Sequence, residues 1–118
     1  SMTESLKLTV EDKGPVLAVI YTDGYINNQG GEELGKLAYE LIDQGKRHLL
    51  LNLAGTKIVN SIGISILIEI IERMLELEGR LAFCNLTPTI EKTFHIMGLA
   101  QYAGIFADED AAEAGLAG

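Results

Sequence analysis

The sequence has no tryptophan, a single cysteine, few positive charges and no long hydrophobic run. The lone cysteine, Cys84, cannot form an internal disulfide, which is typical of proteins from a reducing compartment such as the cytoplasm. No apolar run is long enough to span a bilayer, and the first residues lack the basic-then-apolar pattern of a signal peptide. Ser1, which precedes Met2, is interpreted as an expression remnant.

Positive charge is scarce because 17 acidic residues face only 9 lysines and arginines, giving a formal net charge of −8. This balance argues against a partnership with nucleic acid through phosphates and against docking on anionic membranes. It would instead steer the chain toward a basic protein surface. The sequence does not define the oligomeric state.

The groups that usually perform chemistry are also scarce. His48, His95 and Cys84 are isolated from one another, so no metal-ligand spacing is present. No nucleophile-elbow motif starts a catalytic triad, and Gly30-Gly31 lacks the spacing of a dinucleotide fingerprint. We therefore expect no catalytic residue, no metal and no cofactor, and a binding protein rather than an enzyme.

With 47% apolar residues in 118, the chain has enough hydrophobic side chains for one folded domain covering residues 1–118. Five segments have the composition of strands: 6–11, 16–21, 49–53, 81–85 and 103–107. Four have the spacing or composition of helices: 32–44, 62–78, 87–98 and 108–116. The glycine-rich stretch 23–31 is interpreted as a loop.

The element order β-β-α-β-α-β-α-β-α predicts an α/β layer sandwich with about four helices. The first two strands should pair as a hairpin, and strands joined through helices should run parallel, so the sheet is mixed but mostly parallel. In the third helix, which Thr87 and Pro88 should start, Met97 is expected on the inner stripe with Ile90 and Phe94. The acidic segment 108–118 is interpreted as a frayed helix carrying solvated charge.

The helix over 62–78 dominates the pattern, and Ser61 is interpreted as its N-cap. The apolar side chains fall on one arc of the helical wheel: Ile64, Ile66, Leu67, Ile68, Ile70, Ile71, Met74, Leu75 and Leu77. The opposite arc is polar: Ser61, Ser65, Glu69, Glu72, Arg73 and Glu76. One face should therefore be core and the other exposed.

Two residues of this helix do not fit the two faces. Gly63 lies on the apolar arc although glycine costs about 1 kcal/mol against alanine in a helix, so its turn should pack close against a neighbouring backbone. Ile62 lies among the polar residues, either as an ordinary exposed side chain or as a contact for a partner.

Ser61 also has two interpretations. A serine at a helix start is normally only a cap. A phosphate there would meet free amides and the positive end of the helix dipole, so it would add negative charge without melting the helix. The surface around Ile62, Ser65 and Glu69 would then become more acidic, as a reversible binding switch requires.

The chain contains the stretch Asn60-Ser61-Ile62-Gly63-Ile64 and, in order around it, the short segments 24–27, 51–53 and 98–99. Together these four segments resemble the STAS family of anti-sigma factor antagonists, in which a D-S-[SA]-G-[LIV] stretch similar to residues 60–64 carries the phosphorylated serine. Gly24-Tyr25-Ile26-Asn27 looks like its G-x-[LIV]-D segment, Leu51-Asn52-Leu53 like its [LIV]-[DN]-[LIV] strand, and Gly98-Leu99 like its G-L pair. The resemblance covers nearly the whole chain.

The resemblance implies a phosphorylation switch. An unphosphorylated antagonist binds an anti-sigma factor that is also a serine kinase and so frees a sigma factor. The kinase phosphorylates the serine, here Ser61, which weakens the complex, and a serine phosphatase reverses the modification. The expected partner-binding residues are Asn27, Asn60, Ser61, Ile62, Ser65 and Glu69.

Three residues depart from the family pattern. Asn27 and Asn60 replace aspartates, keeping the hydrogen-bonding shape without the charge, and Ile62 replaces a small residue. These departures suit a second hypothesis, a constitutive scaffold subunit of a stress-signalling assembly or of a lipid-transport ATPase. A third hypothesis is a domain that binds a small ligand such as a nucleotide or lipid.

Overall fold

The computed structural model describes residues 5–117, so the proposed remnant Ser1 lies outside the described residues. The strands are β1 (Leu6–Asp12), β2 (Leu17–Ile26), β3 (His48–Val59), β4 (Arg80–Cys84) and β5 (Gly104–Phe106). The helices are α1 (Asn28–Asp43), α2 (Ser61–Glu76), α3 (Pro88–Ile96) and α4 (Glu109–Ala117), and a 3₁₀ turn, η2 (Leu99–Gln101), follows α3.

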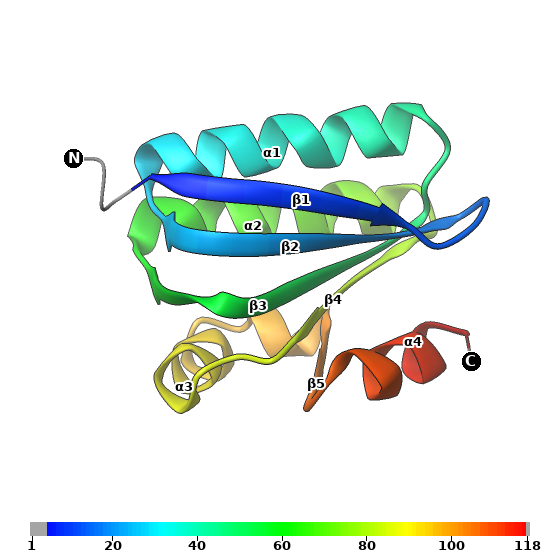
Figure 1. Ribbon diagram of the computed structural model, residues 1–118. Helices are drawn as coiled ribbons and strands as arrows, with labels where there is room; N and C mark the ends of the chain where they lie inside the picture. The colour runs from blue at the N-terminus through cyan, green and yellow to red at the C-terminus, as the bar shows by residue number, and fades with distance from the viewer. Residues whose placement is uncertain (1–4, 118) are drawn as a thin grey trace.

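The strands form a single sheet in the order β1-β2-β3-β4-β5 (Figure 1). β1 runs antiparallel to β2, while β2, β3, β4 and β5 are parallel neighbours. The predicted element order and the mixed, mostly parallel sheet are therefore confirmed. Because each crossover moves one strand along the sheet in the same direction, right-handed connections place α1, α2 and α3 on one face.

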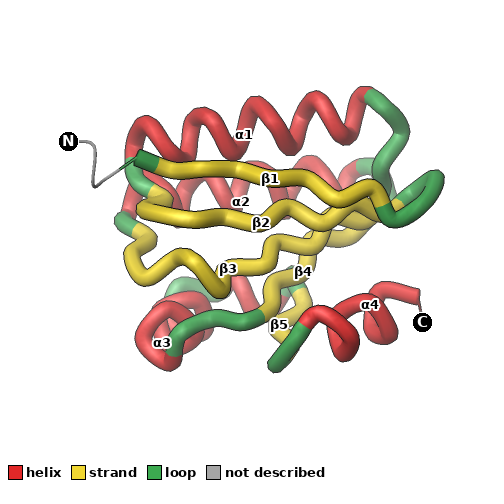
Figure 2. The backbone as a smooth tube through the Cα atoms, viewed as in Figure 1, coloured by secondary structure: helices red, strands yellow, loops and turns green. Residues whose placement is uncertain are grey.

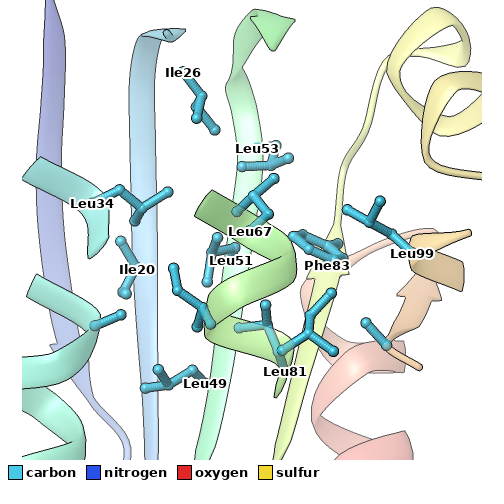
Figure 3. Packing of buried hydrophobic residues seen from close by; sticks show 14 of the residues in the cluster. Ile20, Ile26, Leu34, Leu49, Leu51, Leu53, Leu67, Leu81, Phe83 and Leu99 are labelled. Atoms are coloured by element: carbon cyan, nitrogen blue, oxygen red, sulfur yellow. The ribbon is translucent and has the colours of Figure 1, made fainter. Parts of the chain in front are cut away.

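The core lies between this face and its helices. Ile20, Leu51 and Phe83 point from three adjacent strands toward Leu67 of α2 (Figure 3). The ring of Phe83 meets that of Phe94 of α3 edge-on, with centroids 4.9 Å apart, a favoured aromatic geometry. The central strands are nearly continuous apolar sequences because the second face of the sheet is also partly covered.

That second face is covered by α4. Val19, Leu50, Ala82 and Cys84 pack there against two residues of the helix, Ala112 and Leu116. The sequence predicts this helix, but the expectation that it is frayed is wrong, because Ala112 and Leu116 are buried against the sheet. Its first turn is also tied down, since the Tyr21 hydroxyl lies 2.7 Å from Glu109 Oε1. The expectation that the acidic residues at its start are only solvated charge is thus wrong for Glu109, which is half-buried.

The Tyr21 phenol provides a test of this attachment. Burial and the adjacent Glu109 and Glu11 carboxylates raise the pKa of the phenol above its ordinary value, so it stays a hydrogen-bond donor. We expect Tyr21→Phe to lower the free energy of unfolding by about 1 kcal/mol, because Glu109 loses a donor. Urea unfolding followed by circular dichroism measures this. The matched control is Tyr102→Phe, which removes an exposed hydroxyl; an equal loss in both variants would contradict the attachment.

One segment of the sequence interpretation is wrong. Residues 23–31 are not a loop, because β2 continues to Ile26 and α1 begins at Asn28 instead of Glu32. β2 continues because it pairs with β3 as far as Val59. Gly24 has a positive φ of 123° and lies beside irregularities in the register of this pairing. Tertiary pairing therefore overrides the turn-like composition.

Candidate functional site

The candidate site lies at the carboxyl edge of the parallel strands. There β2 leads through Asn27 into α1, and β3 leads through Asn60 into α2. The two short turns lie at the same end of the sheet (Figure 2). This edge is where parallel α/β sheets usually present their functional groups.

Both asparagines cap helices. Asn27 Oδ1 accepts a hydrogen bond from the Gly30 amide at 2.9 Å, and Asn60 Oδ1 accepts one from the Gly63 amide at 2.8 Å. Asn60 Nδ2 also donates to Asn28 Oδ1 at 3.3 Å, which joins the beginnings of the two helices. The two positions where the family pattern has aspartate therefore carry neutral caps.

The prediction that Ser61 is the N-cap of α2 is wrong. Asn60 has extended backbone angles and caps the helix, so Ser61 is its first helical residue. Asparagine and serine cap helices about equally well, and here the asparagine oxygen already occupies the Gly63 amide. The Ser61 hydroxyl is exposed and has no hydrogen-bond partner within residues 5–117. It lies at the positive end of the α2 dipole.

Gly63 explains how the first turn of α2 approaches the sheet so closely. A Cβ at this position would lie 2.2 Å from the Ile26 carbonyl oxygen, so only glycine fits. The Asn60 amide donates to the same oxygen at 3.1 Å. Gly31 of α1 faces this turn, since a Cβ there would lie 3.6 Å from Gly63 Cα. The predicted close backbone contact at Gly63 is confirmed, and it fixes where Ser61 lies.

The remaining predicted partner residues follow the exposed side of α2. Ile62 is 45% exposed, and Ser65 and Glu69 are exposed further along the helix. Ser65 Oγ donates to the Ser61 carbonyl at 3.1 Å. The structure thus brings the predicted residues together on one edge and one helix face. The sequence interpretation missed Ile58 in the extended end of β3, which is also 45% exposed.

Cap loss provides a second test. We expect Asn60→Ala to cost about 1 kcal/mol of stability, because the Gly63 amide loses its acceptor. Asn60→Asp, the matched control, keeps the acceptor for the Gly63 amide but loses the donation to Asn28 Oδ1. Because a carboxylate is favourable at a helix N-terminus, its stability should stay close to that of the wild type. Urea denaturation compares the three proteins. Equal stability of Asn60→Ala and wild type would contradict the role of this cap.

The described part of the chain offers few reactive groups elsewhere. Within residues 5–117 there is no cluster of three or more histidine, cysteine or acidic side chains that could hold a metal ion. Cys84 is fully buried, and burial raises the pKa of its thiol to about 12, so it is an unreactive packing residue. His95 lies on the α3 surface, with Nε2 3.9 Å from Glu91 Oε2. No helix among these residues is both long and apolar enough to cross a membrane.

Comparisons with known proteins match this architecture. A family model described as the STAS domain matches residues 7–112. A protein of Bordetella bronchiseptica named "Putative anti-sigma factor antagonist BtrV" is 26% identical over 109 residues, covering 92% of this chain and 93% of that protein.

Solved structures share the fold. An anti-sigma factor antagonist from Mycobacterium paratuberculosis has a TM-score of 0.86 and 19% identity, covering 98% of this chain and 97% of that one. The Bacillus cell fate determinant SpoIIAA in its phosphorylated form has a TM-score of 0.73 and 20% identity, covering 92% and 98%.

Proposed function

Since the chain belongs to the STAS domain family, we propose that it is a cytoplasmic anti-sigma factor antagonist controlled by phosphorylation of Ser61. Unphosphorylated, it binds an anti-sigma factor that is also a serine kinase, and a sigma factor is released for transcription. The kinase phosphorylates Ser61, the complex dissociates, and a serine phosphatase resets the cycle. The domain is a ligand and a substrate and performs no catalysis itself.

The observation that carries this proposal is the position of Ser61. Its hydroxyl is exposed, is not needed as a cap, and lies on the first turn of α2. A phosphate there adds about −1.5 to −2 charges near the positive end of a helix dipole, so the helix survives. The name of the Bordetella relative supports the role of anti-sigma factor antagonist, and the phosphorylated form of the Bacillus neighbour supports control by phosphorylation.

The neutral caps bear on how the switch would work. Asn27 and Asn60 keep both helix starts formed without placing a carboxylate beside Ser61. A new phosphate would therefore meet no repulsion from these two caps, and its charge would change the surface in one large step. The exposed Ile62 beside it provides the apolar contact that the unphosphorylated form offers a partner.

The same asparagines favour a second candidate function, a constitutive scaffold subunit. The two side chains do structural work as caps, and neither supplies a charge that could orient a serine hydroxyl or a kinase. A scaffold needs the shape of this edge and not its phosphorylation. Its binding would be the same with and without negative charge at residue 61.

A pull-down from the source cell distinguishes the two functions. Wild type and Ser61→Asp are used side by side, with Thr89→Asp as the matched control, because it adds the same charge to an exposed hydroxyl position in the first turn of α3. Mass spectrometry should identify an ATP-binding kinase with wild type and Thr89→Asp, but not with Ser61→Asp. Recovery of the same partner by all three proteins would support the scaffold instead.

A further inference from the structure

An apolar groove of about 490 Å³ lies between α2 and the segment Met97–Tyr102. Three large side chains line it and remain open to solvent: Leu75 is 45% exposed, Met97 52% and Tyr102 62%. The partly buried Ile68 and the buried Leu99 also line it. The apolar pattern assigned Leu75 and Met97 to the core, and that assignment is wrong. Exposed apolar side chains gathered in one place mark a surface that another molecule covers.

The groove is continuous with the Ser61 edge. Ser61, Ser65, Ile68, Glu72 and Leu75 follow one another at intervals of four, three, four and three residues, so they form a single stripe along α2. At 1.5 Å per residue, the stripe extends for about 21 Å from Ser61 to Leu75. A helix laid along α2 could therefore contact Ser61 with one end and fill the groove with the other.

Charge restricts what can occupy the groove. Glu72 lines it, and Glu69 and Glu76 are exposed on the same helix. A second copy of the chain would bring the same acidic rim and a further net charge of −8. Anionic lipids and nucleotide phosphates would be repelled in the same way. An apolar surface with basic flanks is complementary to both the lining and the rim.

We propose that this groove receives an amphipathic helix of the partner protein, with leucine-like side chains on one face and lysine or arginine beside them. The proposal rests on the proposed function, because it extends that partner's contact from Ser61 along α2 to Leu75. Apolar side chains of the incoming helix pack against Leu75, Met97 and Tyr102. Its basic residues meet Glu69, Glu72 and Glu76, and they make association faster at low salt.

A binding measurement with the anti-sigma factor separates this contact from the phosphorylation switch. Leu75→Ser should weaken the complex by about tenfold, because a buried leucine contact is lost. Ile96→Ser is the matched control, since Ile96 is 70% exposed, adjacent in sequence to Met97 and outside the groove lining. If Leu75→Ser binds as wild type while Ser61→Asp does not, the groove proposal fails and the switch stands. If Leu75→Ser weakens binding and Ser61→Asp binds as wild type, the groove proposal stands and the phosphorylation switch is overturned.

A probe that does not depend on the partner completes the test. It is a synthetic peptide of about 18 residues, long enough to form a helix, with leucine at helical spacing and lysine elsewhere. Its pair carries glutamate in place of lysine. In NMR spectra of the whole chain, the lysine peptide should shift the amide signals of Ile68, Leu75 and Met97. Leu75→Ser should reduce the affinity of the chain for the lysine peptide about tenfold. The proposal is overturned if neither peptide shifts these amides or if both do so equally. It is also overturned if the chain dimerises through Leu75.

Discussion

Replacing Ser61 with aspartate is expected to weaken the complex with the anti-sigma factor by about 100-fold or more. The new carboxylate would be buried beside Ile62 in the interface, where an uncompensated charge is costly. A 100-fold loss corresponds to about 2.7 kcal/mol, which is within the cost of one poorly solvated charge. Calorimetric titration of the purified proteins measures the affinity directly.

The same substitution should leave the fold intact. Ser61 is the first helical residue of α2, and a negative charge there is worth about 0.3–1 kcal/mol in favour of the helix. The free energy of unfolding of Ser61→Asp should therefore equal or slightly exceed that of the wild type. Urea denaturation measures this free energy. A clearly lower value for Ser61→Asp than for the wild type would mean that the loss of binding comes from unfolding and not from the new charge.

Gly63→Ala is expected to destabilise the domain by about 3 kcal/mol or more, at the upper end of the cost of overpacking. The new Cβ would lie 2.2 Å from the Ile26 carbonyl oxygen and 3.0 Å from Ile26 Cγ2. Backbone atoms cannot move aside as a flexible side chain can, so α2 must shift away from β2. The better helix propensity of alanine returns only about 1 kcal/mol.

Gly35→Ala is the matched control for this substitution. Gly35 is also buried within a helix, but its added Cβ would lie 3.5 Å from Ile66 Cγ2, an ordinary contact. We expect this variant to be more stable than wild type by up to about 1 kcal/mol. Urea denaturation followed by circular dichroism compares the two variants. Equal stability of Gly63→Ala and Gly35→Ala would contradict the close approach of α2 to Ile26.

The sequence predicts the framework of the site well because strong local signals agree with the fold. The apolar period of α2 correctly identifies the buried Leu67, Ile70 and Met74, and Thr87 caps α3 as expected, with Oγ1 3.2 Å from the Ile90 amide. Gly63 is costly inside a helix, and that cost correctly indicates a tight contact. In each case, one local preference has one structural explanation.

The errors arise where local preferences are balanced or where distant parts of the chain decide. Asn60 and Ser61 are adjacent residues that cap about equally well, so local preference does not decide which of them is the N-cap of α2. Gly30 and Gly31 look like loop residues but lie inside α1. Glycine stands at residue 30 because a Cβ there would lie 2.4 Å from the Tyr25 carbonyl oxygen, a tertiary contact that the sequence does not show. Leu75 belongs to the apolar arc of α2, yet the segment after α3 does not cover it.

A phosphorylation assay shows whether Ser61 is the switch. The chain is incubated with the anti-sigma factor, magnesium and ATP, and peptide mapping by mass spectrometry locates any phosphate. We expect the wild type to carry one phosphate, on Ser61, and then to leave the complex. Ser61→Ala should carry no phosphate and should stay bound. A wild-type chain that binds the anti-sigma factor and stays unmodified at Ser61 would contradict the phosphorylation switch and favour the constitutive scaffold.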